Sequence, residues 1–112
     1  PNIKVAAVEP DTSAVISGEP AGPHKLQGIG AGFIPDTLNT KVIDEIMKIN
    51  TEEAYEAGKA LPREEGFLVG ISAGAALAAA TKLAKLPENK GKNIVVVLPD
   101  SGDRYLSSEM FA

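Results

Sequence analysis

The apolar positions of this chain fall into short runs, separated by polar stretches that are rich in Gly and Pro. Four of the runs contain many β-branched residues, which predicts buried strands at residues 3–8, 42–49, 67–71 and 93–98. The run at 42–49 also fits the start of a helix. Helices are expected between the strands, and each strand is apolar on both faces. This order indicates an α/β fold with a parallel sheet.

Two helices are predicted, and the first has signals at both of its ends. Asn50 followed by Glu53 fits a capping box, so a helix is expected to begin directly after Asn50. Pro62 lacks a backbone donor and clashes with the carbonyl of Gly58, which predicts that this helix stops or kinks there. Gly58 and Pro62 together predict a weak helix. An Ala-rich stretch predicts the second helix at residues 73–85.

Composition narrows the possible functions. The 112 residues are 44% apolar and carry a formal net charge of −4, which favours one folded domain over a disordered chain. No apolar run approaches the roughly 20 residues that a membrane-spanning helix needs. The absence of Cys excludes a thiolate metal site, a single His cannot build a zinc site, and the acidic balance disfavours nucleic-acid binding. We expect a cytoplasmic protein without a metal, and the start at Pro1, with no initiator Met, suggests a fragment.

Residues 11–40 are rich in Gly and Pro and show no sustained period, which predicts a long and functional loop. Three glycines lie within five residues, at Gly28, Gly30 and Gly32, so the backbone there is expected to pass close to a ligand or another strand. They do not form a dinucleotide-binding fingerprint, because the third glycine of that motif would fall at Phe33 and no strand precedes it.

The most informative junction is residues 70–74, where a predicted strand is followed by Ser72 and then almost at once by a helix. In open parallel sheets, ligands bind at the carboxyl ends of strands, where helix N-termini present free amides. The alternative is that Ser72 is only an N-cap. The turn at residues 100–103 follows another predicted strand, and lies beside Ser72 if the two strands are neighbours. A nucleophile elbow is disfavoured, because the GxSxG pattern alone is weak and the single His precedes the Ser.

Three motifs together resemble cysteine synthases, the O-acetylserine sulfhydrylases of the fold-type II pyridoxal-phosphate family. They are GPHKLQGIGAGFIP at 22–35, LVGISAGAALAAA at 68–80 and VVVLPDSGDRYLS at 95–107. The resemblance implies that residues 1–112 are the C-terminal part of the large, parallel-sheet catalytic domain. It implies a cytoplasmic homodimer that uses pyridoxal 5′-phosphate to make L-cysteine and acetate from O-acetylserine and sulfide.

The resemblance also implies roles for individual residues. Ser72 matches the family's Ser that donates a hydrogen bond to the pyridine nitrogen of the cofactor, which suits a neutral ring. The family's substrate-binding loop at the mouth of the active site matches Gly28, Gly30 and Ala31. His24 and Lys25 match the loop where the C-terminal tail of serine acetyltransferase docks. The family often has a Lys shortly before this motif, but this chain has Pro20-Ala21 there. The expected docking loop therefore lacks that positive charge.

Several family elements precede the matched region and are missing from these 112 residues: the Schiff-base Lys, the Asn loop that binds the substrate carboxylate, and the phosphate-binding loop. We therefore expect no catalytic residue in this chain, and no activity from it alone. Two alternatives stay open. One is a cystathionine β-synthase-like enzyme or an O-phosphoserine sulfhydrylase on the same scaffold. The other is a non-catalytic α/β fragment that binds a partner or itself through an unpaired sheet edge.

Overall fold

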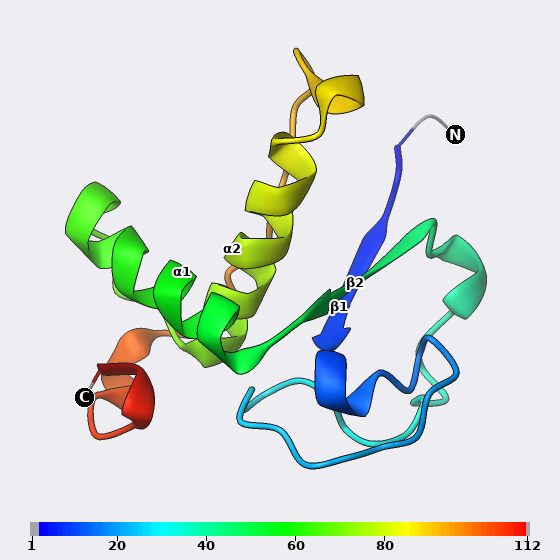
Figure 1. The fold of residues 1–112 in the computed structure, drawn as a ribbon, viewed down its shortest axis with the longest axis horizontal. Coiled ribbons are helices and arrows are strands. Elements are labelled where there is room, and N and C mark those ends of the chain that lie inside the picture. Colours follow the sequence, from blue (N-terminus) through cyan, green and yellow to red (C-terminus); the bar gives the residue numbers. More distant parts are fainter. Residues whose placement is uncertain (1–2, 112) are drawn as a thin grey trace.

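The computed structural model describes residues 3–111, in which a two-stranded sheet lies beside a pair of helices (Figure 1). Strand β1 spans Ala6–Pro10 and pairs in parallel with β2, Glu45–Ile49. The register aligns the first residues of the two strands with each other, and likewise the last. The predicted parallel α/β arrangement is confirmed. Within the run at 42–49, residues 45–49 form a strand, whereas Val42 belongs to a short 3₁₀ turn. The first strand begins and ends later than the predicted range 3–8. It includes Pro10, which we expected to lie just after its end.

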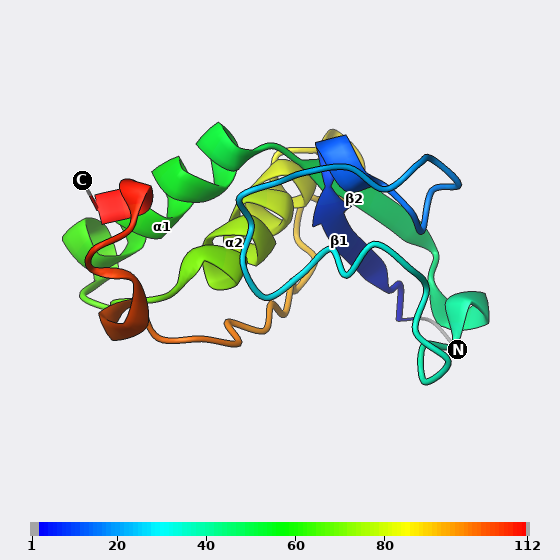
Figure 2. The same ribbon diagram turned by 90° about the horizontal axis from the view of Figure 1, so that it is seen from below.

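The segment between the strands is largely irregular, as its Gly and Pro content predicts. It contains two short 3₁₀ turns, at Asp11–Ser13 and Thr40–Val42. Figure 2 shows part of it passing close to α2. Gly28, Gly30 and Gly32 have φ angles of 98°, 66° and 87°, a left-handed conformation in which a side chain would be strained.

Helix α1 spans Thr51–Glu65 and begins with the predicted capping box. The Glu53 N–H donates to Asn50 Oδ1 at 2.8 Å, and the Asn50 N–H donates to Glu53 Oε1 at 3.2 Å. Of the two outcomes predicted at Pro62, a stop is wrong, because α1 continues through that residue to its C-cap Gly66, which is left-handed with φ of 79°. Pro62 lies in the last turn, where its missing N–H costs a single hydrogen bond, and its own carbonyl accepts from the Gly66 N–H.

Helix α2 spans Ile71–Ala84 and starts two residues earlier than predicted. Gly70 is the N-cap, so the interpretation of Ser72 as an N-cap is wrong: Ser72 is the second residue inside the helix. The cap is supplied from a distance. Asp100 Oδ1 accepts a hydrogen bond from the Ala73 N–H at 3.0 Å, which satisfies one of the free amides at the start of the helix.

Two predicted strands do not form. Residues 67–71 contribute one isolated antiparallel bridge, between Val69 and Ser101, and residues 93–98 pair with no strand of the described chain. Figure 2 shows the second segment running past α2 instead. The side chains of Val95 and Val97 are 91% and 73% exposed. A ladder needs a neighbouring backbone about 4.8 Å away, and β1 and β2 pair only with each other within residues 3–111.

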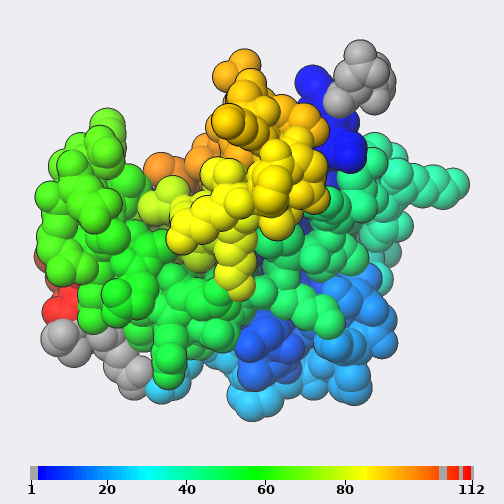
Figure 3. Space-filling view, turned by 45° about the horizontal axis from the view of Figure 1, so that its top comes forward, coloured from blue at the N-terminus to red at the C-terminus, as the bar shows by residue number. Residues whose placement is uncertain are grey.

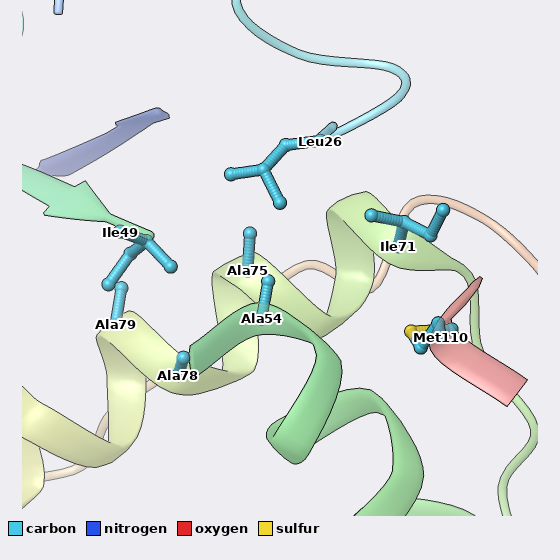
Figure 4. Packing of buried hydrophobic residues seen from close by; sticks show 8 residues of the cluster. All are labelled: Leu26, Ile49, Ala54, Ile71, Ala75, Ala78, Ala79 and Met110. Carbon is cyan, nitrogen blue, oxygen red and sulfur yellow. The ribbon is translucent and has the colours of Figure 1, made fainter. Parts of the chain in front are cut away.

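The core lies where α1 crosses α2 beneath the end of β2 (Figure 4). Half of its eight buried residues are Ala, and these small side chains allow close helix packing: Leu26, Ile49, Ala54, Ile71, Ala75, Ala78, Ala79 and Met110. Leu26 reaches this cluster from the irregular segment. In the space-filling view, the end of α2 and the residues after it project at the top of the face shown (Figure 3). None of the described helices could cross a membrane.

Candidate active site

Ser72 is held at the start of α2 by its helix and by the segment that follows residue 98. Ser72 is buried, with 5% of its surface exposed. The Gly70 N–H donates to the Asp100 carbonyl at 3.1 Å, and the neighbouring Ala73 N–H donates to the Asp100 carboxylate. The turn at 100–103 does lie beside the Ser72 junction, although neither segment is a strand of the sheet: they meet through this helix cap and the isolated bridge between Val69 and Ser101.

Gly28, in the irregular segment, lies close to the Ser72 hydroxyl. A Cβ built on Gly28 would lie 3.3 Å from Ser72 Oγ and 3.5 Å from Ser72 Cβ. A side chain at position 28 would therefore crowd the hydroxyl, and the left-handed φ disfavours one in any case. Two of the predicted site residues, 44 positions apart in the sequence, are thus brought together by the fold.

The glycine loop, defined as residues 28–32, lines a pocket of about 370 Å³. Strand β1, the turn after it and the loop around Pro35 form the other walls. The lining residues are Val8, Glu9, Ser13, Val15, Ile16, Gly28, Ile29, Gly30, Ala31, Gly32, Pro35 and Leu38. The predicted substrate-binding residues therefore share one pocket. Ser72 is not among these lining residues, and it lies next to the loop at Gly28.

The pocket lining also contains a buried carboxylate that the sequence patterns did not single out. Glu9 is 3% exposed. Its Oε1 accepts from the Ile16 N–H at 2.9 Å, and its Oε2 accepts from the Ser17 N–H at 3.1 Å and the Ser17 hydroxyl at 2.6 Å. These bonds fix the turn that forms the wall. A Glu inside an otherwise apolar strand is the signal that could have identified it, because a buried charge needs partners.

His24 and Lys25 lie at different depths. Lys25 is exposed, whereas His24 is half-buried and uses both ring nitrogens within the chain. Its Nδ1 accepts from the Leu26 N–H at 3.1 Å, and its Nε2 is 2.8 Å from the Gly30 carbonyl oxygen. The docking role implied for these two residues stays a prediction.

Asp100 is the second residue that sequence reasoning undervalued, since its composition indicated only a turn. Besides capping α2 through Oδ1, it has a buried Oδ2 without a hydrogen-bond partner in the described part of the chain. The available signal was the start of α2 itself. No Ser, Thr, Asp or Asn occupies the N-cap, so the acceptor had to come from elsewhere in the chain.

In chemical terms, the site combines a hydroxyl at a helix N-terminus with a loop whose nearby residue, Gly28, has no side chain. The hydroxyl of Ser72 can donate one hydrogen bond to a neutral ring nitrogen. Because Gly28 and Gly30 carry no Cβ, no side chain crowds the Ser72 hydroxyl or the His24 ring at these positions. Such an arrangement suits a flat heterocycle and a small polar substrate.

Comparisons with known proteins agree with this description. Residues 1–100 match the model of the family described as "Pyridoxal-phosphate dependent enzyme". A cysteine synthase from Staphylococcus aureus is 52% identical over 112 residues, which is 100% of this chain and 36% of that protein. The chain thus spans about a third of the length of the curated relatives it matches.

Solved structures give the same picture. The cysteine synthase (OASS) of Entamoeba histolytica superposes with a TM-score of 0.95 at 48% identity, covering 97% of this chain and 32% of that one. The O-acetylserine-dependent cystathionine β-synthase of Helicobacter pylori gives a TM-score of 0.83 at 39% identity, covering 98% and 35%. The chain therefore belongs to the family of pyridoxal-phosphate-dependent enzymes.

Proposed function

We propose that this chain is the C-terminal part of a cysteine synthase that converts O-acetyl-L-serine and sulfide into L-cysteine and acetate. The relative from Staphylococcus aureus carries the name cysteine synthase and aligns along the whole of this chain. The Entamoeba histolytica structure, named as OASS, has a higher TM-score and identity than the cystathionine β-synthase of Helicobacter pylori. Both comparisons favour sulfide as the nucleophile over a larger thiol.

The observation that carries the proposal is the approach of Gly28 to the Ser72 hydroxyl. A Cβ on Gly28 would lie 3.3 Å from Ser72 Oγ, and the loop that contains it lines a pocket of about 370 Å³. Ser72 would hold the pyridine nitrogen of the cofactor, and the glycine loop would face the substrate. When bound, pyridoxal 5′-phosphate withdraws electrons from the substrate, so that acetate can leave the β-carbon and sulfide can replace it.

The contribution of this chain is binding and orientation. The Ser72 hydroxyl donates a hydrogen bond that sets the orientation of a neutral ring. Three of the five residues of the glycine loop have no side chain, which leaves room for an amino-acid substrate beside their backbone. Glu9 and the turn it holds form another part of the pocket lining. We propose no catalytic residue in this chain, and hence no activity from these 112 residues alone.

The exposed apolar side chains support a larger assembly. Ile3, Phe67, Val95 and Val97 are 83%, 65%, 91% and 73% exposed, and such surface is normally buried against other polypeptide. In the proposed enzyme it would contact the remaining two-thirds of the protein. The cytoplasmic location, the homodimer and the docking of a serine acetyltransferase tail near His24 and Lys25 belong to the same proposal.

The decisive experiment is an assay of the cysteine synthase that carries this chain, with O-acetylserine and O-phosphoserine as donors, and sulfide and homocysteine as nucleophiles. We expect O-acetylserine with sulfide to be the best pair. Ser72→Ala should lower kcat/KM about tenfold, the order expected for one hydrogen bond to a bound group. Ser107→Ala, at an exposed position, is the control. Preference for homocysteine would assign a cystathionine β-synthase, and turnover by the 112 residues alone would contradict the proposed inactivity.

A further inference from the structure

The hydrogen bonds of His24 define the tautomer of its ring. Nδ1 is 3.1 Å from the backbone N of Leu26, and Nε2 is 2.8 Å from the carbonyl oxygen of Gly30. A backbone N–H can only donate and a carbonyl can only accept. Nδ1 must therefore be unprotonated and Nε2 must carry the hydrogen. The ring is neutral, and its Nε2–H donates to Gly30.

The backbone of His24 is held in place by contacts of the residues that precede and follow it in the sequence. Leu26, two residues after His24, is fully buried in the core between the two helices (Figure 4). Pro23, one residue before it, accepts a hydrogen bond from the Thr12 hydroxyl at 2.7 Å, which ties it to the turn after β1. Because its neighbours in the chain are held in this way, the position of the His24 Nε2–H is fixed as well.

Gly30 lies against the ring so closely that no other residue would fit. A Cβ built on Gly30 would lie 2.5 Å from His24 Nε2 and 2.6 Å from Pro10 Cγ, and Gly30 has φ of +66°. The same residue lines the pocket of about 370 Å³. The hydrogen bond from His24 thus reaches the backbone of the pocket wall directly.

We propose that His24 is a positioning residue, whose Nε2–H fixes the backbone of the glycine loop and so the shape of the pocket. This inference rests on the proposed function in one respect: the pocket is taken to receive the amino-acid substrate. The hydrogen bond from the Leu26 N–H selects the tautomer of the ring. The hydrogen bond to the Gly30 carbonyl then holds the glycine loop at a fixed position relative to the core. Without the second bond, the loop has more conformations to lose when substrate binds, so affinity falls.

Two substitutions separate the two bonds of the ring. His24→Gln can place an amide N–H where Nε2 stands, which keeps the donor to Gly30. His24→Asn can place an amide oxygen where Nδ1 stands, which keeps only the acceptor for Leu26. In the cysteine synthase that carries this chain, we expect Asn to raise KM for O-acetylserine about threefold to tenfold, with kcat within about twofold. Gln should restore most of the loss.

Other kinetic outcomes would overturn the inference. Equal KM values for the two variants would show that the bond to Gly30 has no special role, and a smaller effect of Asn than of Gln would show that the bond to Leu26 matters more. A purely structural role would lower the yield of folded enzyme and leave KM unchanged.

A spectroscopic readout does not depend on activity. The ¹⁵N spectrum of the wild-type protein, with the His24 signals assigned by their loss in His24→Gln, should show a protonated Nε2 and an unprotonated Nδ1. The opposite tautomer at neutral pH would overturn the inference. If the wild-type protein shows this tautomer but lacks sulfhydrylase activity, the proposed function fails and the positioning of the loop by His24 stands.

Discussion

Gly58 of α1 and Gly74 of α2 meet where the two helices cross. A Cβ built on Gly74 would lie 3.2 Å from both Cα and N of Gly58, and it would also collide with the carbonyl oxygen of Ala54. The absence of side chains at these positions lets the helix backbones approach each other directly. Gly58, which the sequence marks as a weak point of α1, is thus a packing position.

The two glycines predict opposite responses to the same substitution. Gly74→Ala places a methyl group against backbone, which cannot move aside, so we expect a loss of about 1–2 kcal/mol in the free energy of unfolding after the gain in helix propensity. Gly58→Ala places the methyl 2.6 Å from Met110 Sδ, on a flexible side chain that can shift. Its effect should be close to zero. Urea unfolding of the two variants tests this, and equal losses would contradict it.

Asp100 predicts a long-range effect on α2. Asp100→Ala removes the acceptor of the Ala73 N–H, and we expect a loss of about 1 kcal/mol, as for a lost N-cap. Asp100→Asn retains an oxygen at that place and should lose less. Asp103→Ala, at an exposed position of the same turn, is the control and should change little. If Asp103→Ala destabilised the chain as much as Asp100→Ala, the cap would not be the cause.

The features that the sequence predicts correctly are local. The capping box at Asn50 and Glu53 needs only residues within one turn, so α1 begins where the pattern indicates. The strands at 67–71 and 93–98 have suitable apolar runs, but a strand also needs a partner backbone, which no local pattern contains. The cap of α2 likewise comes from Asp100, 27 residues after Ala73.

The candidate site shows the same division. Three glycines in five residues predict a close backbone approach, and Gly28 and Gly30 do approach the side chains of Ser72 and His24. Which side chains they meet depends on how residues 11–40 fold back over α2, and that is a tertiary property. The role of Glu9 was missed for this reason, because its partners only become visible once the turn after β1 is formed.

Glu53 predicts a pH dependence of stability. Its hydrogen bond with the Lys82 side chain, opposed by burial and helped by the Asn50 backbone, lowers the pKa of the carboxyl below its ordinary value of 4.5. A lowered pKa contributes stability above pH 4.5 that is lost as the pH falls through the folded value. Because the pair is partly exposed, the contribution is at most about 1 kcal/mol.

Glu53→Gln keeps an acceptor for the Asn50 N–H and removes the charge. We expect its deficit relative to wild type to be constant near pH 7 and to shrink below pH 4.5, measured by urea unfolding across pH. Glu56→Gln, on an exposed face of α1, is the matched control. A deficit that grows toward acid pH would have the wrong sign and would refute the assignment.

The wall of the pocket depends on the charge of Glu9. Glu9→Gln turns one of two acceptor oxygens into a donor that faces the N–H of Ile16 or the N–H and hydroxyl of Ser17, so we expect a loss of about 1–3 kcal/mol. Amide hydrogen exchange at Ile16 and Ser17 should rise more than in the rest of the chain. Glu19→Gln breaks only an exposed ion pair with Lys48 and should cost less than about 1 kcal/mol. Equal exchange in the two variants would mean that the buried carboxylate does not hold this turn.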